Sequence, residues 1–359
     1  MRTVRVNIPS HAYDITVSPG LLSDIGPHLR RLTASPKAAL VTDSHVAPLY
    51  AQTVQRSLES AGFTIALATI PAGEQHKTLA TLSTIYDRIL SFGVERSTPL
   101  VALGGGVVGD MTGFSAATIL RGIPFVQVPT TLLSMVDASV GGKTGIDHPV
   151  GKNLIGAFHQ PIAVLIDPAV LRSLPPRELR SGLAECIKHD IIRDPAGFDS
   201  LEQNISRALS LDVDYLADLV AHNVAIKAKV VESDPFEKAD RAHLNFGHTF
   251  GHAIETVSNY AYAHGEAVAL GMIAASHLAS DIGLLPATSV QRITTLISSA
   301  GLPTSGLTLD PDRILSSMIY DKKVKSGRLR FILPTQIGQV TIRDDIPSDA
   351  MRTAIMKLV

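Results

Sequence analysis

Apolar residues in the first half of the chain form short continuous runs, separated by amphipathic segments. Runs of this length predict buried strands, and they lie at 37–43, 63–71, 98–106, 124–131 and 163–168. Residues 46–62 and 78–93 instead place an apolar side chain every three or four positions, which predicts helices. Strands that alternate with helices imply a mainly parallel sheet covered on both faces.

The pattern changes near residue 170. Beyond it, most segments have the 3.6-residue period of helices: 179–192, 210–234, 246–257, 265–283, 289–301 and 349–359. Short strands are expected only at 328–335 and 338–344. We therefore predict a Rossmann-like α/β domain over residues 1–170, followed by a mainly helical domain over residues 171–359.

The composition narrows the functional class. The 359 residues are 45% hydrophobic and 18% charged, as in a folded globular protein, and 32 basic against 33 acidic residues give a formal net charge of −1. This balance provides no general attraction to nucleic acid or to an anionic membrane, so any anion site must be local. The N-terminus lacks the apolar segment of a signal peptide, and Cys186 is the single cysteine. These features predict a cytoplasmic protein without disulfides.

A glycine-rich turn follows the third predicted strand. Gly104, Gly106 and Gly109 have the G-x-G-x-x-G spacing, which lets the backbone approach a dinucleotide pyrophosphate at a helix start. A tight turn without a ligand would give the same pattern. The turn follows the third strand rather than the first, and no acid about 20 residues further on is placed to hold a ribose. Both points favour a relative of the Rossmann fold over its standard form. The acid that binds the ribose hydroxyls would then be Glu74, in the loop 71–78.

The stretch GGKT at 141–144 is similar to the end of a P-loop. A P-loop needs a glycine five residues before Gly142, and this chain has Asp137 there. A carboxylate would repel a triphosphate, so an NTPase is disfavoured. Lys143 in this stretch, with Lys152 and Asn153 shortly after it, still indicates an anion site.

Three histidines lie within 17 residues. His248 and His252 are four positions apart, hence on one helix face, and His264 begins the next predicted helix. The zincin motif has a glutamate after the first histidine, which is missing here. A divalent metal bound by two histidines and a carboxylate such as Glu185 remains plausible, as do histidines of the surface or the core.

Seven blocks in order between about residues 70 and 335 resemble the 3-dehydroquinate synthase family. They include PAGEQHK, GGGVVGDMTGF, VPTTLLSMVDASVGGKTGID, LPPRELRSGLAECIKH and NFGHTFGHAIE. The resemblance implies an NAD domain and a helical domain with the active site between them. It also implies conversion of a seven-carbon sugar phosphate, 3-deoxy-arabino-heptulosonate 7-phosphate, to 3-dehydroquinate and phosphate.

The same resemblance implies roles for individual residues. The ligands of zinc or cobalt would be Glu185, His248 and His264, with His252 nearby as an acid/base or substrate contact. NAD would contact Glu74, Lys77, Gly105, Gly106, Val107, Asp110, Thr130 and Thr131. Residues where substrate meets cofactor would be Asp137, Lys143, Lys152 and Asn153. The substrate site would also include Lys188, Lys227, Arg241, Asn245 and Lys322 or Lys323. Arg121 would enter the site of a second subunit, which implies a homodimer.

Three alternatives stay open at this point. Other sugar phosphate cyclases use the same opening chemistry on related substrates, and a version acting on an aminated substrate would have a nearly identical site. Metal-dependent alcohol or glycerol dehydrogenases share the two-domain plan but consume NAD. A non-catalytic relative that binds a nucleotide or a partner is disfavoured by the intact histidine and lysine set.

Overall fold

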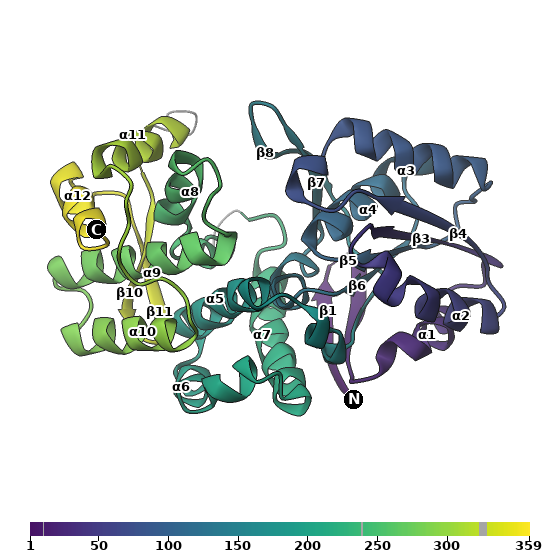
Figure 1. The fold of residues 1–359 in the computed structure, drawn as a ribbon, viewed down its shortest axis with the longest axis horizontal. Helices are drawn as coiled ribbons and strands as arrows, with labels where there is room; N and C mark the ends of the chain where they lie inside the picture. Colours follow the sequence, from purple (N-terminus) through teal and green to yellow (C-terminus); the bar gives the residue numbers. More distant parts are fainter. Residues whose placement is uncertain (10, 238–239, 323–328) are drawn as a thin grey trace. The chain divides into compact units, whose positions relative to one another are not determined.

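A computed structural model describes residues 1–9, 11–237, 240–322 and 329–359 (Figure 1). The described chain forms two compact units. Unit 1 contains residues 1–174 and 213–236, and unit 2 contains residues 175–212 and 237–359. No helix among the described residues is both long and apolar enough to cross a membrane.

Unit 1 is built on a seven-stranded sheet with the order β1-β2-β9-β6-β5-β3-β4. Only the β1–β2 hairpin is antiparallel. The strands are β1 (Arg2–Ile8), β2 (His11–Val17), β3 (Lys37–Asp43), β4 (Thr64–Ile70), β5 (Leu100–Gly104), β6 (Phe125–Pro129) and β9 (Ala163–Ile166). The predicted buried runs therefore form the parallel part of the sheet, and their continuous apolar character reflects burial on both faces.

Helices cover both faces of this sheet (Figure 1). The helices α3 (Leu79–Ser91) and α4 (Gly106–Thr118) cover one face, and α1 (Ile25–Leu32) and α2 (Gln52–Ser60) cover the other. The core beneath α3 and α4 includes Val41, Ile85, Leu100 and Met111, all fully or almost fully buried. A short π-helical turn, Ala47–Ala51, leads into α2.

The helix α7 (Val213–Ser233) belongs to unit 1, although it follows helices of unit 2 in the sequence. It packs on β1, and Arg2 Nε lies 2.5 Å from the Asp218 carboxylate. The backbone N–H of Asn7 donates to the Glu232 carboxylate. This arrangement differs from the single boundary expected near residue 170, because helical periodicity identifies an apolar face without identifying the surface that it covers.

The stretch 141–159 forms a hairpin that the sequence pattern did not predict. Its strands are β7 (Lys143–His148) and β8 (Gly151–Phe158). Most of β8 is exposed, so its sequence shows neither a buried run nor an alternation. The segment similar to a P-loop thus enters a strand, whereas the P-loop lysine precedes a helix.

Unit 2 is mainly helical and surrounds the buried helix α9 (His264–Asp281). Its other helices are α5 (Pro176–Arg193), α6 (Pro195–Leu209), α8 (His248–Val257), α10 (Ala287–Ser299), α11 (Pro311–Lys322) and α12 (Ser348–Met356). The expected strands form the hairpin of β10 (Phe331–Gln336) and β11 (Gln339–Arg343). The helices α6 and α11 were not predicted. The predicted combination of a parallel α/β unit and a mainly helical unit is confirmed.

Candidate functional site

The glycine turn of unit 1 connects β5 directly to the N-terminus of α4. Gly105 is the residue before the helix, and a Cβ added there would lie 3.2 Å from the Thr131 methyl carbon. A Cβ on Gly104 or Gly109 would instead overlap the side chains of Val108 or Gln127. Gly104 and Gly109 therefore permit close packing of side chains. At Gly105 no side chain covers the backbone N–H groups at the start of the 13-residue helix α4. Such a helix start attracts phosphate.

A buried lysine links this helix to the β7–β8 hairpin. Lys77 Nζ lies 2.6 Å from Asp110 Oδ2 in α4 and 2.5 Å from Asn153 Oδ1 in β8. Burial by itself would lower the pKa of Lys77, but the charges of Asp110 and Glu74 raise it, so the ammonium remains charged. Nearby, Lys152 Nζ is 3.8 Å from Glu74 Oε1. Five residues expected to contact the cofactor or the substrate beside it thus lie together: Glu74, Lys77, Asp110, Lys152 and Asn153.

Asn153 has a left-handed backbone, with φ of 56°. Its backbone N–H donates to Asp147 Oδ1 across the hairpin, and the Asp147 N–H donates to the carbonyl of Lys77. These bonds hold Asn153 in the left-handed region, which asparagine adopts more readily than most residues with a side chain. The hairpin therefore presents the Asn153 side chain in a fixed position against Lys77.

The other predicted residues of unit 1 lie at separate places. Asp137 is paired with the buried Lys227 of α7, whose Nζ is 2.7 Å from Asp137 Oδ1 and also donates to the Asp137 carbonyl. Thr130 is buried, and Lys143 at the start of β7 is exposed. Arg121 is also exposed, and its φ of 65° belongs to a tight turn after α4.

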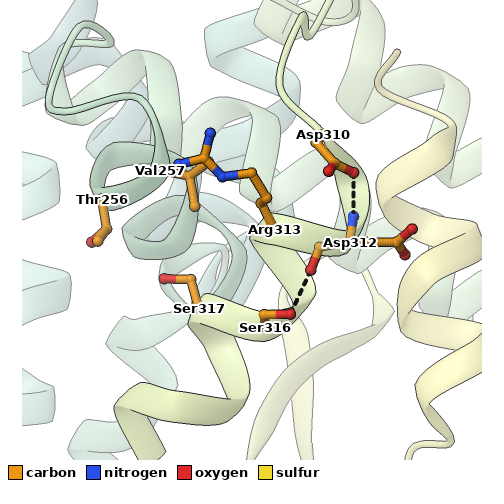
Figure 2. Close-up of a pocket in the computed structure, with 7 residues that line it drawn as sticks. All are labelled: Thr256, Val257, Asp310, Asp312, Arg313, Ser316 and Ser317. Atoms are coloured by element: carbon orange, nitrogen blue, oxygen red, sulfur yellow. Dashed lines mark hydrogen bonds between the residues drawn. The ribbon is translucent and has the colours of Figure 1, made fainter.

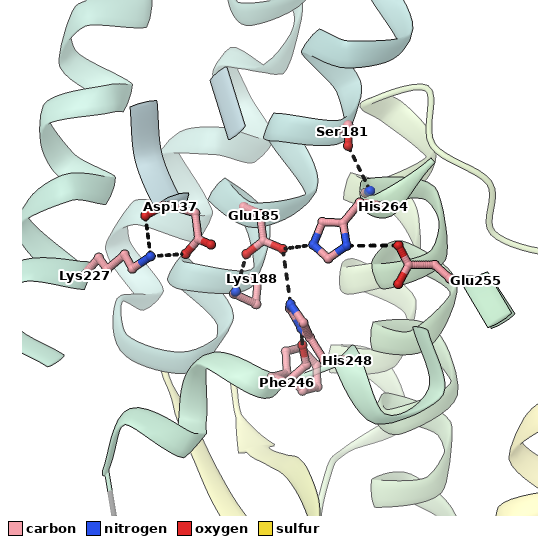
Figure 3. A network of polar contacts seen from close by, with 10 residues as sticks. Asp137, Ser181, Glu185, Lys188, Lys227, Phe246, His248, Glu255 and His264 are labelled. Carbon is pink, nitrogen blue, oxygen red and sulfur yellow. Dashed lines mark hydrogen bonds and ion pairs between the residues drawn. The ribbon is translucent and has the colours of Figure 1, made fainter. Parts of the chain in front are cut away.

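A carboxylate and two histidines converge in unit 2 (Figure 3). Glu185 lies in α5, while His248 and His264 are the first residues of α8 and α9. Glu185 Oε1 is 3.7 Å from His248 Nε2 and 3.5 Å from His264 Nε2. All three ligand atoms lie within 4.8 Å of one another, so one ion could contact all of them. Two imidazoles and a carboxylate suit zinc and leave positions open for a substrate.

The protein environment orients each of these groups. The second oxygen of the fully buried Glu185 is paired with Lys188. His248 Nδ1 is 3.1 Å from the Phe246 carbonyl, so this nitrogen keeps its proton and Nε2 faces Glu185. Burial and the Lys188 ammonium hold the pKa of His248 well below its usual range. His248 is therefore neutral at pH 7, as metal binding requires.

His264 lies between two carboxylates. Its Nε2 faces Glu185, and its Nδ1 is 3.2 Å from Glu255 Oε1. Burial opposes the charge of His264, but the hydrogen bonds to Glu185 and Glu255 raise its pKa to about 10. Glu255 was not singled out in the sequence. The signal that could have identified it is its position seven residues after His248, on the same face of α8.

Glycines allow the two histidine-bearing helices to approach each other closely. A Cβ on Gly271 of α9 would lie 2.0 Å from the carbonyl oxygen of Gly247, and one on Gly251 would lie 3.1 Å from the carbonyl of Ala267. Backbone therefore meets backbone where α8 crosses α9. This contact sets the spacing of His248 and His264.

Other predicted residues of unit 2 have varied surroundings. We call Glu185, His248 and His264 together the metal-ready set. The ring centres of His252 and His248 are 5.2 Å apart, so His252 lies beside this set. Arg241 is buried, and Asn245 Nδ2 donates to Glu237 Oε1 at 3.2 Å. Lys323 lies outside the described residues, and only the helical backbone of Lys322 is described.

A surface hollow of about 460 Å³ lies elsewhere in unit 2 (Figure 2). Its lining comes from the end of α8, from Asp310 just before α11 and from the first turns of α11, and consists of Thr256, Val257, Asp310, Asp312, Arg313, Ser316 and Ser317. None of these residues was predicted as a site residue. The lining combines an arginine with two aspartates, and its hydrogen bonds from Asp312 N to Asp310 and from Ser316 to Asp312 are local to α11.

Solved structures with this fold include sugar phosphate cyclases. The chain is 30% identical to ValA, the 2-epi-5-epi-valiolone synthase of Streptomyces hygroscopicus subsp. jinggangensis, solved with NAD+ and Zn2+ bound; the match covers 98% of each chain with a TM-score of 0.90. A 2-deoxy-scyllo-inosose synthase complexed with carbaglucose-6-phosphate, NAD+ and Co2+ is 26% identical over 100% of each chain, with a TM-score of 0.91. A probable glycerol dehydrogenase from Sinorhizobium meliloti, 17% identical over 96% of this chain and 95% of that chain, shows a likeness of fold at a TM-score of 0.64. The architecture is that of the cyclases.

Sequence comparison identifies the family within this class. Family models described as 3-dehydroquinate synthase N-terminal and C-terminal match residues 67–181 and 182–324. The chain is 50% identical to the 3-dehydroquinate synthase of Desulforamulus reducens, over 96% of this chain and 97% of that protein. It is 48% identical to that of Microcystis aeruginosa, over 98% and 97%. The chain belongs to the 3-dehydroquinate synthase family, and it is an enzyme of that family.

Proposed function

We propose that the protein converts 3-deoxy-D-arabino-heptulosonate 7-phosphate to 3-dehydroquinate and phosphate, acting as a carbon–oxygen lyase. The observation that supports this most directly is the Glu185, His248 and His264 set in a chain with nearly full-length identity to 3-dehydroquinate synthases. The chemistry of these donors fits zinc or cobalt(II). The open helix start at Gly105 and Gly106 fits the pyrophosphate of NAD.

The two cofactors would supply the chemistry that side chains lack. NAD+ held in unit 1 would supply a hydride acceptor and donor for substrate carbon 5, and a metal ion held by Glu185, His248 and His264 would supply a Lewis acid for the hydroxyls on carbons 4 and 5. Transient oxidation at carbon 5 acidifies the proton on carbon 6, so that phosphate can leave by β-elimination. Reduction, ring opening and an intramolecular aldol step complete the carbocycle, and no NADH accumulates.

In unit 1, the chain's own groups would bind and orient the nucleotide. We assign the pyrophosphate to the turn of Gly105, Gly106 and Val107, together with Thr130 and Thr131. Lys77 and Asp110 form one charged pair, so they hold each other in place beside this turn. Glu74 is the acid available for ribose hydroxyls.

Cationic and amide side chains would hold the substrate. We assign donors to its phosphate from Lys152, Asn153 and Lys143, with Arg121 supplied by a second copy in a homodimer. Asp137 would contact the substrate where it meets the cofactor, and Lys227, paired with Asp137, would contact the substrate. In unit 2, Lys188, Arg241 and Asn245, with Lys322 or Lys323, would hold the carboxylate and hydroxyls.

Proton transfer requires a side chain that can both accept and donate a proton. We assign His252 to this role, beside the ligand His248, and the departing phosphate can itself accept the proton from carbon 6. The remaining contribution of the protein is orientation and fixed charge. We place this chemistry in the cytoplasm, in keeping with a single buried thiol.

The test is phosphate release from the heptulosonate phosphate by purified protein, with NAD+ and zinc, before and after chelation. NADH absorbance is followed in the same cuvette. We expect chelator-sensitive release of one phosphate per substrate without lasting NADH. Steady accumulation of NADH on an alcohol, with no phosphate released, would refute the proposal and favour a dehydrogenase. Release from a related sugar phosphate, but not from the heptulosonate, would indicate another cyclase.

A further inference from the structure

Glu255 contacts the metal-ready set without belonging to it. It lies in α8, two helical turns after His248, and is 7% exposed. Its Oε1 is 3.2 Å from His264 Nδ1, the nitrogen that points away from Glu185 (Figure 3). A nearly buried carboxylate is costly unless it is hydrogen-bonded, and the imidazole supplies such a bond.

The two histidines of the set differ in what holds their second nitrogen. For His248 it is the neutral carbonyl of Phe246, and for His264 it is the charged Glu255. A carboxylate on the outer nitrogen of an imidazole fixes the proton on that nitrogen, orients the ring and increases the electron density at the ligating nitrogen. The ring orientation of His264 is therefore held more strongly than that of His248.

We infer that Glu255 is a positioning residue for the metal: it holds His264 with its Nε2 directed at the ion and strengthens it as a ligand. Glu255 acts through His264 and does not contact the ion. The inference rests on the proposed metal site. It adds a second carboxylate to that site, so that Glu185 is a ligand and Glu255 orients a ligand.

Glu266 provides a matched control. Glu266 is a glutamate of the first turn of α9, two residues after His264, and its carboxylate accepts the backbone N–H of Ala263 at 2.8 Å and pairs with Arg177. Its partners are thus the helix start and a surface arginine. Replacing Glu266 tests whether any loss of a carboxylate at this helix start loosens His264.

The experiment measures zinc affinity of the full chain by competition with a chelating dye, without substrate or NAD. We expect Glu255→Ala to weaken zinc binding about 10- to 100-fold. Glu255→Gln retains an oxygen that can accept from Nδ1–H, so it should restore part of the affinity. Glu266→Ala should bind zinc as the wild type does. The absorption spectrum of the cobalt(II) form should change for the Glu255 variants and not for Glu266→Ala, because it reports ligand geometry.

Each outcome separates the inference from the proposal beneath it. If the wild-type protein binds no zinc, the proposed metal site itself is refuted. Wild-type zinc binding with equal affinity in Glu255→Ala would overturn only the role of Glu255. An equal loss in Glu255→Ala and Glu266→Ala would also overturn it, since removing any carboxylate near His264 would then have the same effect. If Glu255→Ala does not fold, the comparison of Glu255→Gln with Glu266→Gln decides in the same way.

Discussion

Gly265 places the start of α9 against α5, and its replacement tests how the metal-ready set is assembled. Gly265 follows His264 directly, and its backbone N–H donates to Ser181 Oγ at 2.9 Å. An alanine Cβ at this position would lie 2.3 Å from Cα and 2.4 Å from the carbonyl oxygen of Ser181. Both are backbone atoms of the helix that contains Glu185. No rotation of a side chain can relieve this overlap.

The size of the effect follows from these distances. Ordinary van der Waals contact begins at 3.4 Å, so the start of α9 must move away from α5 by about 1 Å, which as overpacking costs about 1–3 kcal/mol of stability. Zinc–ligand distances tolerate only about 0.2 Å. Moving His264 from Glu185 by about 1 Å should therefore weaken zinc binding about 10- to 100-fold, as the loss of a ligand's orientation does in other metal sites.

The assay compares Gly265→Ala with Gly283→Ala, measuring unfolding by urea and zinc affinity by dye competition. Gly283 lies just beyond the other end of α9, has φ of 76° and has no atom within 4 Å of an added Cβ. Its replacement should cost about 1 kcal/mol through backbone strain and leave zinc affinity unchanged. Wild-type zinc affinity in Gly265→Ala would refute the claim that this contact positions His264.

Three further predictions concern charged or titrating groups. Lys77→Met should lower stability by about 3 kcal/mol in urea unfolding, because it leaves Asp110 without its buried partner; an unchanged midpoint would contradict the structural role of the pair. Zinc binding at pH 8 should release about one proton, since the raised pKa of His264, about 10, keeps it protonated in the metal-free protein and the ion displaces a proton from Nε2. Calorimetry in buffers of different ionisation enthalpy measures this number, which should fall as the pH rises through 10. Burial, with Asp190 and Glu185 nearby, raises the pKa of Cys186 well above 9.0, so Ellman's reagent at pH 8 should label this thiol in denaturant but not in the native protein.

The sequence was most informative where one residue pattern corresponds to one structure. The run 37–43 is β3, residue for residue, because the middle of a strand buried on both faces is almost entirely apolar. The glycine turn lies between a strand and a helix, as its spacing predicted. The hairpin of β7 and β8 was missed because β8 is exposed over most of its length, and an exposed strand needs no particular side chains.

The apolar periodicity of the sequence could not show that Glu185, His248 and His264, which are far apart in the chain, lie together in the fold. The pairing of His248 with His264 depends on two helix starts that meet, and Glu185 comes from a helix 63 residues before His248. The resemblance to a family supplied that grouping. Glu255 was overlooked because a glutamate near the end of an amphipathic helix normally faces solvent; only the packing of α8 on α9 turns it inward.

The glycine contact between α8 and α9 has a consequence for the choice of ion. Gly251 and Gly271 bring backbone against backbone at this crossing, and the Met272 side chain packs directly on Gly247, so the spacing of the two helices has little room to change. The distance between the two imidazoles is thus set before any ion arrives. A preorganised pair of this kind cannot widen for a larger cation, yet it presents the same donors to zinc and to cobalt(II). Selection between those two ions then falls to their supply in the cell.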